Sequence, residues 1–220
     1  MGRFSTQKAR HVQQQLAKLV EEHDHFINPP RRICGLDATY LSDEAIGAAV
    51  VLNFPSLQLI EQRTIRCQAP IPYIPTLLSF REFPPLSLAF KALQTQPDLC
   101  FVDAHGRAHP YKLGAASHFG VLHNIPTIGV AKKILCGTVR TQKSKFDEIY
   151  LENELVGARV NSKKGYNPLF VSVGHRVSLS TAVLITQACI TKYKLPEPIR
   201  LAHNLATETR RKLLNGDALE

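Results

Sequence analysis

The stretch LeuCysPheValAsp, residues 99–103, runs from four apolar side chains directly into an aspartate. IleCysGlyLeuAsp, residues 33–37, repeats the pattern, and a third acid, Glu82, closes PheArgGlu at 80–82. An ionised carboxylate beside apolar surface is costly unless a cation or a hydrogen-bond partner compensates it. We therefore expect Asp37, Glu82 and Asp103 to meet at a metal site. Taken singly, each acid fits an ordinary strand-end or helix-surface position equally well.

The composition is that of a globular protein with a large positive charge. Of 220 residues, 44% are hydrophobic and 20% are charged, so a single domain over residues 1–220 is expected. The 27 Lys and Arg residues outnumber the 18 Asp and Glu residues, which gives a net charge of +9. This excess favours a polyanionic partner, although basic charge can also serve solubility alone.

Neither an export signal nor a membrane span is visible in the sequence. The first ten residues hold no apolar signal core, and no stretch approaches the roughly 18 apolar residues that a span needs. The cysteines are odd in number and lie mostly in apolar runs, at positions 34, 67, 100, 136 and 189. We expect reduced thiols in a cytoplasmic protein that contacts no membrane.

The pattern of apolar residues changes once along the chain. An amphipathic helix is expected at 7–22, with Val12, Leu16, Leu19 and Val20 on one side, and three strands with short turns follow at 32–40, 45–53 and 57–67. Such short turns force antiparallel pairing. From residue 76 helices and strands alternate, which implies parallel strands with crossover helices. The expected elements are a helix from 76 that restarts after Pro84 and Pro85, a strand at 98–103, a helix at 113–124, strands at 126–131, 154–160 and 168–173, and a helix at 178–191.

This element order is that of an α/β protein with a ribonuclease H-like mixed sheet flanked by helices. In that fold, carboxylates on the first and fourth strands lie close together at the centre of the sheet. Asp37 is expected to close the first strand and Asp103 the fourth. We expect the core to span about 31–205 and the C-terminal tail to be frayed.

Six short motifs occur in a specific order between residues 31 and 205. They are GlyLeuAsp at 35–37, ProTyrIlePro at 72–75, PheArgGlu at 80–82, AlaHisPro at 108–110, ProThrIleGlyValAlaLys at 126–132 and ArgLeuAlaHis at 200–203. Each is weak alone, but their order and spacing together resemble the endonuclease V family, the inosine-directed repair nucleases. The resemblance implies an endonuclease that recognises deoxyinosine in DNA and cuts the second phosphodiester bond on its 3′ side.

The resemblance also implies a metal centre. Asp37, Glu82 and Asp103 match the family's metal-binding acids, and Mg²⁺, with Mn²⁺ as a substitute, is the expected ion because hard cations prefer oxygen ligands. His203 matches a histidine beside the metal, where it can position or deprotonate water or protonate the leaving group. Lys132 ends an apolar strand, and we expect it to stabilise the charge of the scissile phosphate.

The motif ProTyrIlePro is expected to form a wedge. Its prolines hold an apolar tip on a stiff, extended segment suited to filling the gap left by a displaced base. The segment consists of Pro72, Tyr73, Ile74 and Pro75. His109, in AlaHisPro, is expected to contact the nucleic-acid backbone near the cut.

The chain departs from the family where the base pocket is expected. The family usually reads AspGlyXaaGly, whereas this chain has Asp103, Ala104, His105 and Gly106. With Gly114, Ala104 and Gly106 are expected to line the pocket. A glycine permits positive φ and close approach of a base, so the methyl group of Ala104 puts base preference in doubt.

Three other functions remain open. An RNA-directed member of the same family would cut inosine-containing RNA, and a non-catalytic relative would only bind nucleic acid. A small-molecule α/β enzyme fits the alternation after residue 76, but no glycine-rich phosphate loop follows a strand. We expect the protein to act as a monomer.

Overall fold

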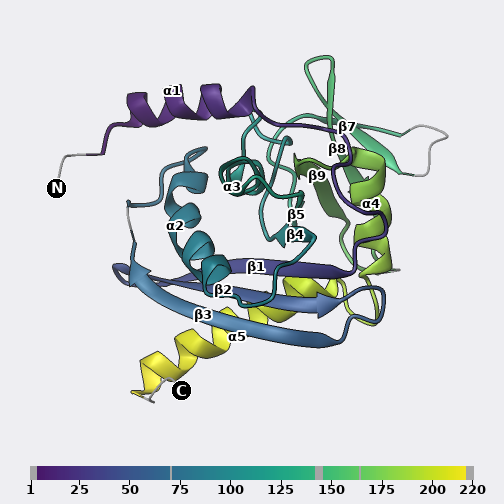
Figure 1. Cartoon of the computed structure of the whole chain (residues 1–220). Helices are drawn as coiled ribbons and strands as arrows, with labels where there is room; N and C mark the ends of the chain where they lie inside the picture. Colours follow the sequence, from purple (N-terminus) through teal and green to yellow (C-terminus); the bar gives the residue numbers. More distant parts are fainter. Residues whose placement is uncertain (1–3, 70, 142–145, 164, 217–220) are drawn as a thin grey trace.

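The structure, a computed structural model, describes residues 4–69, 71–141, 146–163 and 165–216. Its strands form one sheet, and five helices pack around it (Figure 1). The strands are β1 Arg32–Leu41, β2 Glu44–Asn53, β3 Leu59–Gln68, β4 Leu99–Val102, β5 Thr127–Ala131, β6 Thr138–Arg140, β7 Asp147–Leu151, β8 Glu154–Val160 and β9 Leu169–His175. Their order across the nine-stranded sheet is β3-β2-β1-β4-β5-β9-β8-β7-β6.

The three predicted antiparallel strands are confirmed. β1 pairs with β2, and β2 pairs with β3, each through a short turn that permits only antiparallel pairing. Eight consecutive residues of β2 are buried because the sheet is covered on both faces. These strands form the platform on which the first acid stands.

The predicted parallel strands are also confirmed. β4 runs parallel to β1, and β5 runs parallel to β4. Helices α2, Leu78–Lys91, and α3, Ala115–His123, lie in the connections that lead to and from β4. β9 returns antiparallel to β5 and begins the second half of the sheet, and α4, Leu179–Ala188, follows β9.

The sequence predicted that helix α2 would restart after its two prolines. Instead, one continuous helix runs through them. Pro84 and Pro85 lie inside the single helix Leu78–Lys91. Each proline removes one backbone donor, and the packing of Pro85, Leu86 and Ala89 in the core retains the helix.

The N-terminal helix α1, Thr6–Ala17, ends five residues before the predicted boundary and buries another face. Ala9 and Gln13 are its buried residues, whereas Val12 and Leu19 are exposed. Gln13 can be buried because its amide donates to the carbonyl oxygens of Thr76 and Leu113, at 3.0 and 2.9 Å. The hydrogen bonds of Gln13, rather than the pattern of apolar residues, thus determine which face of α1 is buried.

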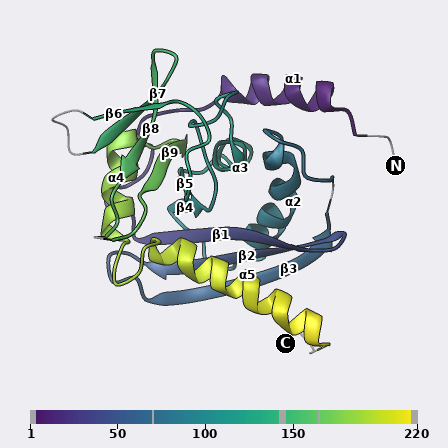
Figure 2. The same cartoon turned by 180° about the vertical axis from the view of Figure 1, so that it is seen from behind.

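The C-terminal segment is helical as far as Asn215, whereas we expected the core to end near residue 205 and a frayed tail to follow. It forms helix α5, Glu197–Asn215, which packs on β1 and β2 on the face opposite α2 (Figures 1 and 2). Glycines permit both contacts: a Cβ at Gly35 would overlap the Pro198 carbonyl of α5, and a Cβ at Gly47 would overlap the Pro85 carbonyl of α2. The last four residues lie outside the described part of the chain.

Strands β6 and β7 were not predicted. Both strands are short, and Ile149 in β7 is the only buried residue of the two. Their sequences therefore lack the apolar alternation that signals a strand. Among the described residues, no helix combines the length and apolar content that a membrane span requires.

His118 on α3 gives the fold a measurable pH dependence. Its ring is buried and stacks on Phe83 with centroids 5.0 Å apart, and burial lowers its pKa to about 4. Unfolded histidine takes up a proton near its ordinary pKa of 6.5, whereas the folded protein does so only near 4. The contribution of His118 to the free energy of unfolding is therefore constant above pH 6.5 and falls as pH drops toward 4.

We predict that His118→Leu reduces this loss of stability. The gap between 6.5 and about 4 corresponds to about 3 kcal/mol, so the variant should gain on wild type by up to that amount at pH 4. Denaturant unfolding of both proteins between pH 4 and 8 measures the difference. His11→Leu, at an exposed position, is the control, and equal slopes for wild type and His118→Leu would contradict the assignment.

Candidate metal centre and nucleic-acid interface

The first and third acids are neighbours because β1 and β4 are parallel and adjacent. Leu36 is paired with Val102, and the next residue on each strand is the acid, Asp37 or Asp103. Asp103 follows the end of β4 as predicted. Asp37 does not close β1, which continues to Leu41 along its antiparallel partner β2, but it stands where the parallel pairing ends.

A histidine from α5 completes a cluster with the two aspartates. One ligand atom each from Asp37, Asp103 and His203 lies within 4.8 Å of the others. The Nδ1 atom of His203 is 2.8 Å from Oδ2 of Asp37, and the ammonium of Lys132 is 2.6 Å from Oδ2 of Asp103. Three distant segments, β1, β4 and α5, thus converge on one point.

Glu82 approaches the aspartates from α2. Burial raises its pKa to about 8, and the negative charges of Asp37 and Asp103 contribute to this shift. Burial and the charge of Asp37 likewise raise the pKa of Asp103, although Lys132 opposes the effect. The hydrogen bond to Asp37 raises the pKa of His203.

Burial, together with the charges of the neighbouring carboxylates, disfavours the ionised forms of Glu82 and Asp103. Three carboxylates repel one another in a site with little access to water, and a bound divalent cation would offset that repulsion. Carboxylate oxygens suit Mg²⁺ or Mn²⁺, and His203 can stand beside the ion without binding it. The residues present therefore fit the ion that the sequence predicts.

A cavity of about 550 Å³ opens beside Asp103. Tyr73 and Thr76 border it from the segment before α2, and Lys132 borders it from the end of β5. Its other lining residues are Leu78, Ser79, Asp103, Ala104, His105, His109, Gly114, Ala115, Ala131, Lys133, Ile134 and Leu135. A concave, largely apolar site with a few polar groups is suited to a planar ligand such as a base.

The backbone at Ala104 accepts alanine without strain. Positive φ angles occur at seven non-glycine residues of the described chain, and Ala104 is not one of them. Gly114 lines the cavity, and a Cβ there would overlap the His105 carbonyl. Gly106, which was expected to line the pocket, is not among the residues that line this cavity; it is buried, and its amide donates to Oγ of Ser172 at 2.8 Å.

The segment 72–75 contributes Tyr73 to the lining of this cavity. Tyr73 is 66% exposed, so its ring is not the packing residue of a buried turn. Helix α1 braces the end of the segment through the next residue, Thr76. Arg10 donates to Oγ1 of Thr76 at 2.8 Å, and Gln13 donates to the Thr76 carbonyl. An exposed ring on a braced segment has the form expected of a wedge.

His109 lies inside the structure, lining the cavity. Its side chain is buried, its Nδ1 accepts from the Tyr111 amide at 3.1 Å, and burial lowers its pKa to about 4. A neutral imidazole can donate or accept one hydrogen bond to a ligand but brings no charge to a phosphate.

A second cavity, of about 510 Å³, shares Lys132 with the first. Its other lining residues are Tyr166, Tyr193, Lys194, Leu195, Arg200 and Asn204. The guanidinium of Arg200 stacks over the Tyr193 ring, 4.3 Å from its centroid. The sequence interpretation missed these residues; the signal was LysTyrLys at 192–194, an aromatic ring between two cations.

Comparison with known proteins gives one consistent family. The sequence profile described as Endonuclease V matches residues 14–204. A curated endonuclease V from Thermofilum pendens is 43% identical over 205 residues, which cover 93% of this chain and 88% of that protein.

Solved structures agree with the sequence matches. An endonuclease V from Streptomyces avermitilis is 35% identical, with a TM-score of 0.89 and 96% of each chain covered. The Ciona intestinalis enzyme, solved with a 24mer DNA containing an inosine followed by a ribo-adenosine, is 28% identical, with a TM-score of 0.85 over 94% of this chain and 98% of that one. These likenesses confirm the ribonuclease H-like fold, and the chain belongs to the endonuclease V family.

Proposed function

We propose that this nuclease recognises inosine in DNA and hydrolyses the second phosphodiester bond on its 3′ side in a metal-dependent reaction. The observation that carries the proposal is a cavity large enough for a base directly beside a cluster of two aspartates and a histidine, with Asp103 belonging to both. Family membership and the inosine-containing DNA bound by the Ciona intestinalis relative support the choice of lesion.

Asp37 and Asp103 would hold Mg²⁺, or Mn²⁺ in its place, with Glu82 contributing from α2. When bound, the ion would polarise the phosphoryl oxygen, lower the pKa of a water molecule and offset charge on the leaving oxygen. Burial and the negative charges of Asp37 and Asp103 raise the pKa of Glu82, which supports this assignment because a cation would favour the ionised carboxylate.

His203 and Lys132 act on the reacting groups. Nδ1 of His203 is engaged by Asp37, so Nε2 is the atom that can hold the attacking water or give a proton to the leaving oxygen. The attacking water loses a proton to Nε2 of neutral His203 or to solvent as its oxygen forms a bond to phosphorus. The bond from phosphorus to the 3′ oxygen breaks, and that oxygen takes up a proton. Lys132 offsets the charge of the phosphate, leaving a 3′-hydroxyl and a 5′-phosphate.

Recognition uses the cavity and the wedge. Tyr73 fills the space that the displaced base leaves in the stack, which offsets part of the few kcal/mol that unstacking costs. The base enters the cavity lined by Ala104, His105, His109 and Gly114. Hydrogen bonds to its edge and the shape of the cavity then select hypoxanthine.

The second cavity receives the strand beyond the cut. Lys132, at the boundary of the two cavities, lies beside the scissile phosphate in this proposal. The strand then continues over Tyr193 and Lys194, which offer a stacking surface and a charge for a phosphate.

An RNA-directed activity is the alternative within the family. The ribo-adenosine after the inosine in the Ciona intestinalis complex is one observation in its favour. Matched DNA and RNA strands with one inosine each, cut in Mg²⁺ under equal conditions, distinguish the two. A non-catalytic relative would cut neither, although it would still bind both.

The first prediction concerns the metal ligands. Asp37→Asn or Asp103→Asn should lower kcat by more than about 100-fold, since even outer-shell partners of a metal contribute 10- to 100-fold. Binding of the inosine strand should persist through phosphate contacts. Asp43→Asn, in an exposed turn, is the control. Near-normal turnover of either variant would contradict the assignment of that aspartate as a metal ligand.

The second prediction concerns the wedge. Tyr73→Ala should weaken cleavage of inosine in a duplex by about 1 to 3 kcal/mol, the contribution of one aromatic stack, and should affect a single strand less. Tyr73→Phe keeps the ring and should behave as wild type. Equal losses on the two substrates would mean that Tyr73 displaces no base.

The third prediction concerns the strand beyond the cut. Lys194→Ala should raise KM for strands that extend several nucleotides past the cleaved bond. It should also reduce the slope of log binding constant against log salt concentration by about 1. Strands that end just past the cut should be bound as well as by wild type. Lys212→Ala, at the far end of α5, is the matched control. An equal effect of Lys194→Ala on both strand lengths would contradict this path.

A further inference from the structure

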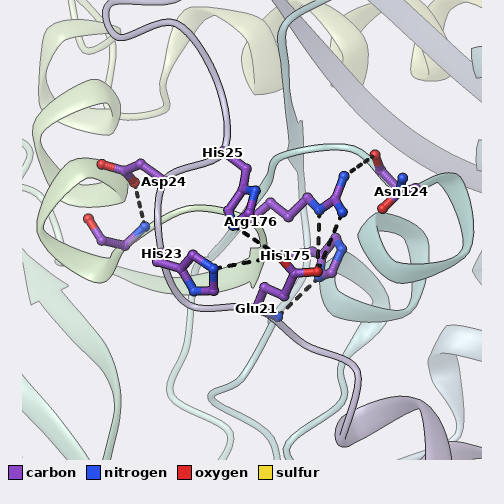
Figure 3. A network of polar contacts seen from close by, with 8 residues as sticks. Glu21, His23, Asp24, His25, Asn124, His175 and Arg176 are labelled. Carbon is purple, nitrogen blue, oxygen red and sulfur yellow. Dashed lines mark hydrogen bonds and ion pairs between the residues drawn. The ribbon is translucent and has the colours of Figure 1, made fainter.

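A second group of metal-ligating side chains lies away from the nuclease site. Glu21, His23 and His25 occupy alternate positions in the segment between α1 and β1, which we call the arm, residues 20–26 (Figure 3). They gather beside Arg176, just past the end of β9, and Asn124, just before β5. Lys132 follows the opposite end of β5, so the arm lies at the other end of this strand from the nuclease site.

The three side chains already have nearly the spacing of a metal site. One ligand atom from each lies within 4.8 Å of the others. Nε2 of His25 is 3.2 Å and Nε2 of His23 is 3.7 Å from Oε2 of Glu21. Ligands at the usual zinc distances in a tetrahedron are separated by roughly 3.3 to 3.5 Å. Only small side-chain movements are needed.

The arm is held in place by its backbone, so the ligands do not depend on a flexible loop. The Arg176 amide donates to the Glu21 carbonyl at 2.7 Å, and the His25 amide donates to the Arg176 carbonyl at 3.2 Å. The Glu21 amide donates to Nδ1 of His175 at 3.2 Å. A site whose backbone is ordered in advance loses little entropy when an ion binds.

Asp24 provides a second anchor. Its carboxylate accepts from the Ser178 amide at 2.6 Å and from Oγ1 of Thr181 at 2.7 Å, at the start of α4. Asp24 therefore faces α4, whereas the residues on either side of it, His23 and His25, face Glu21. This division leaves the two imidazoles together.

The carboxylate of Glu21 divides its two oxygens between different partners. Oε1 faces the Arg176 guanidinium at 3.5 Å, whereas Oε2 faces the two imidazoles. Arg176 can thus orient the carboxylate from behind while Oε2 binds an ion, which is the role that outer partners have at metal sites. The nearby positive charge of Arg176 lowers the affinity but does not occupy the ligand atom.

The donor set selects the kind of ion. Two imidazoles and one carboxylate suit Zn²⁺ and its neighbours Co²⁺, Ni²⁺ and Cu²⁺, whereas Mg²⁺ prefers oxygen ligands alone. The side chain of His23 is 68% exposed and that of His25 is 39% exposed, so water can complete the coordination shell. The arm is thus suited to an ion that the nuclease site does not require.

We propose that Glu21, His23 and His25 bind one Zn²⁺ ion at the surface of this protein, separate from the nuclease centre. The ion fixes the arm against the end of β9 and, through the arm, the position of α1. Since α1 braces the wedge through Gln13 and Thr76, the site links metal availability to the rigidity of the N-terminal region.

The test uses the full chain without a histidine tag, stripped of metal by a chelator. Zn²⁺ is titrated by calorimetry into wild type and into the variants His23→Ala/His25→Ala, His203→Ala and His11→Ala. We expect the double variant to lose one binding event or to weaken it more than tenfold, and His203→Ala and His11→Ala to retain it. The side chains of His23 and His25 are 68% and 39% exposed, so the double variant should fold, which circular dichroism verifies.

Two further measurements keep the outcome clear. Co²⁺ in place of Zn²⁺ should give a visible absorption band of nitrogen ligation that His203→Ala keeps and the double variant lacks. Zn²⁺ should raise the Tm of wild type and His203→Ala more than that of the double variant. Zn²⁺ binding of the same stoichiometry and affinity in the double variant and wild type would overturn the proposal, as would loss of the site in His11→Ala.

Discussion

The repulsion among three carboxylates is the constraint on which the site depends. Asp37 and Asp103 are forced together by the parallel register of β1 and β4, and Glu82 is added from α2. Unfolded chains keep such groups apart in water, so the folded protein must offset their charge. Lys132 and His203 offset part of it through contacts of 2.6 and 2.8 Å. The remaining excess is what suits the site to a divalent cation.

Two close helix contacts deliver the remaining side chains to this point. α5 approaches β1 at Gly35 and carries His203, whereas α2 approaches β2 at Gly47 and carries Glu82. The helices lie on opposite faces of the same strands (Figures 1 and 2). Side chains larger than hydrogen at the two glycines would push both helices away, and the groups that they carry would separate. The packing of the helices on the sheet therefore determines the geometry of the site.

Sequence patterns predicted β1 to β5, β8 and β9 because turns and apolar runs are local signals. The same signals failed for α5, whose buried positions include the small residues Ala202 and Ala206 and whose start carries Pro198. They also failed for the buried face of α1, where Gln13 replaces an apolar residue because two carbonyl groups satisfy its amide. Neither outcome is visible without the partner surface.

The site divides in the same way. The acids, Lys132, His203 and Tyr73 were identifiable because they stand in motifs whose order is specific. The second cavity was not, since Tyr166, Tyr193 and Asn204 come from three separate segments that only the fold brings together. The fit of alanine at position 104 likewise depends on a backbone angle that the sequence does not state.

The account rests on the claim that the acid cluster and the adjoining cavity act on one inosine-containing strand. The most direct measurement maps the cut in two end-labelled DNA strands that differ only by inosine in place of adenine, with Mg²⁺ supplied. The account predicts cleavage of the inosine strand alone, at the second phosphodiester bond on the 3′ side, with a 5′-phosphate on the released fragment. Equal cutting of both strands, or a cut that does not follow the inosine when it is moved, would contradict it.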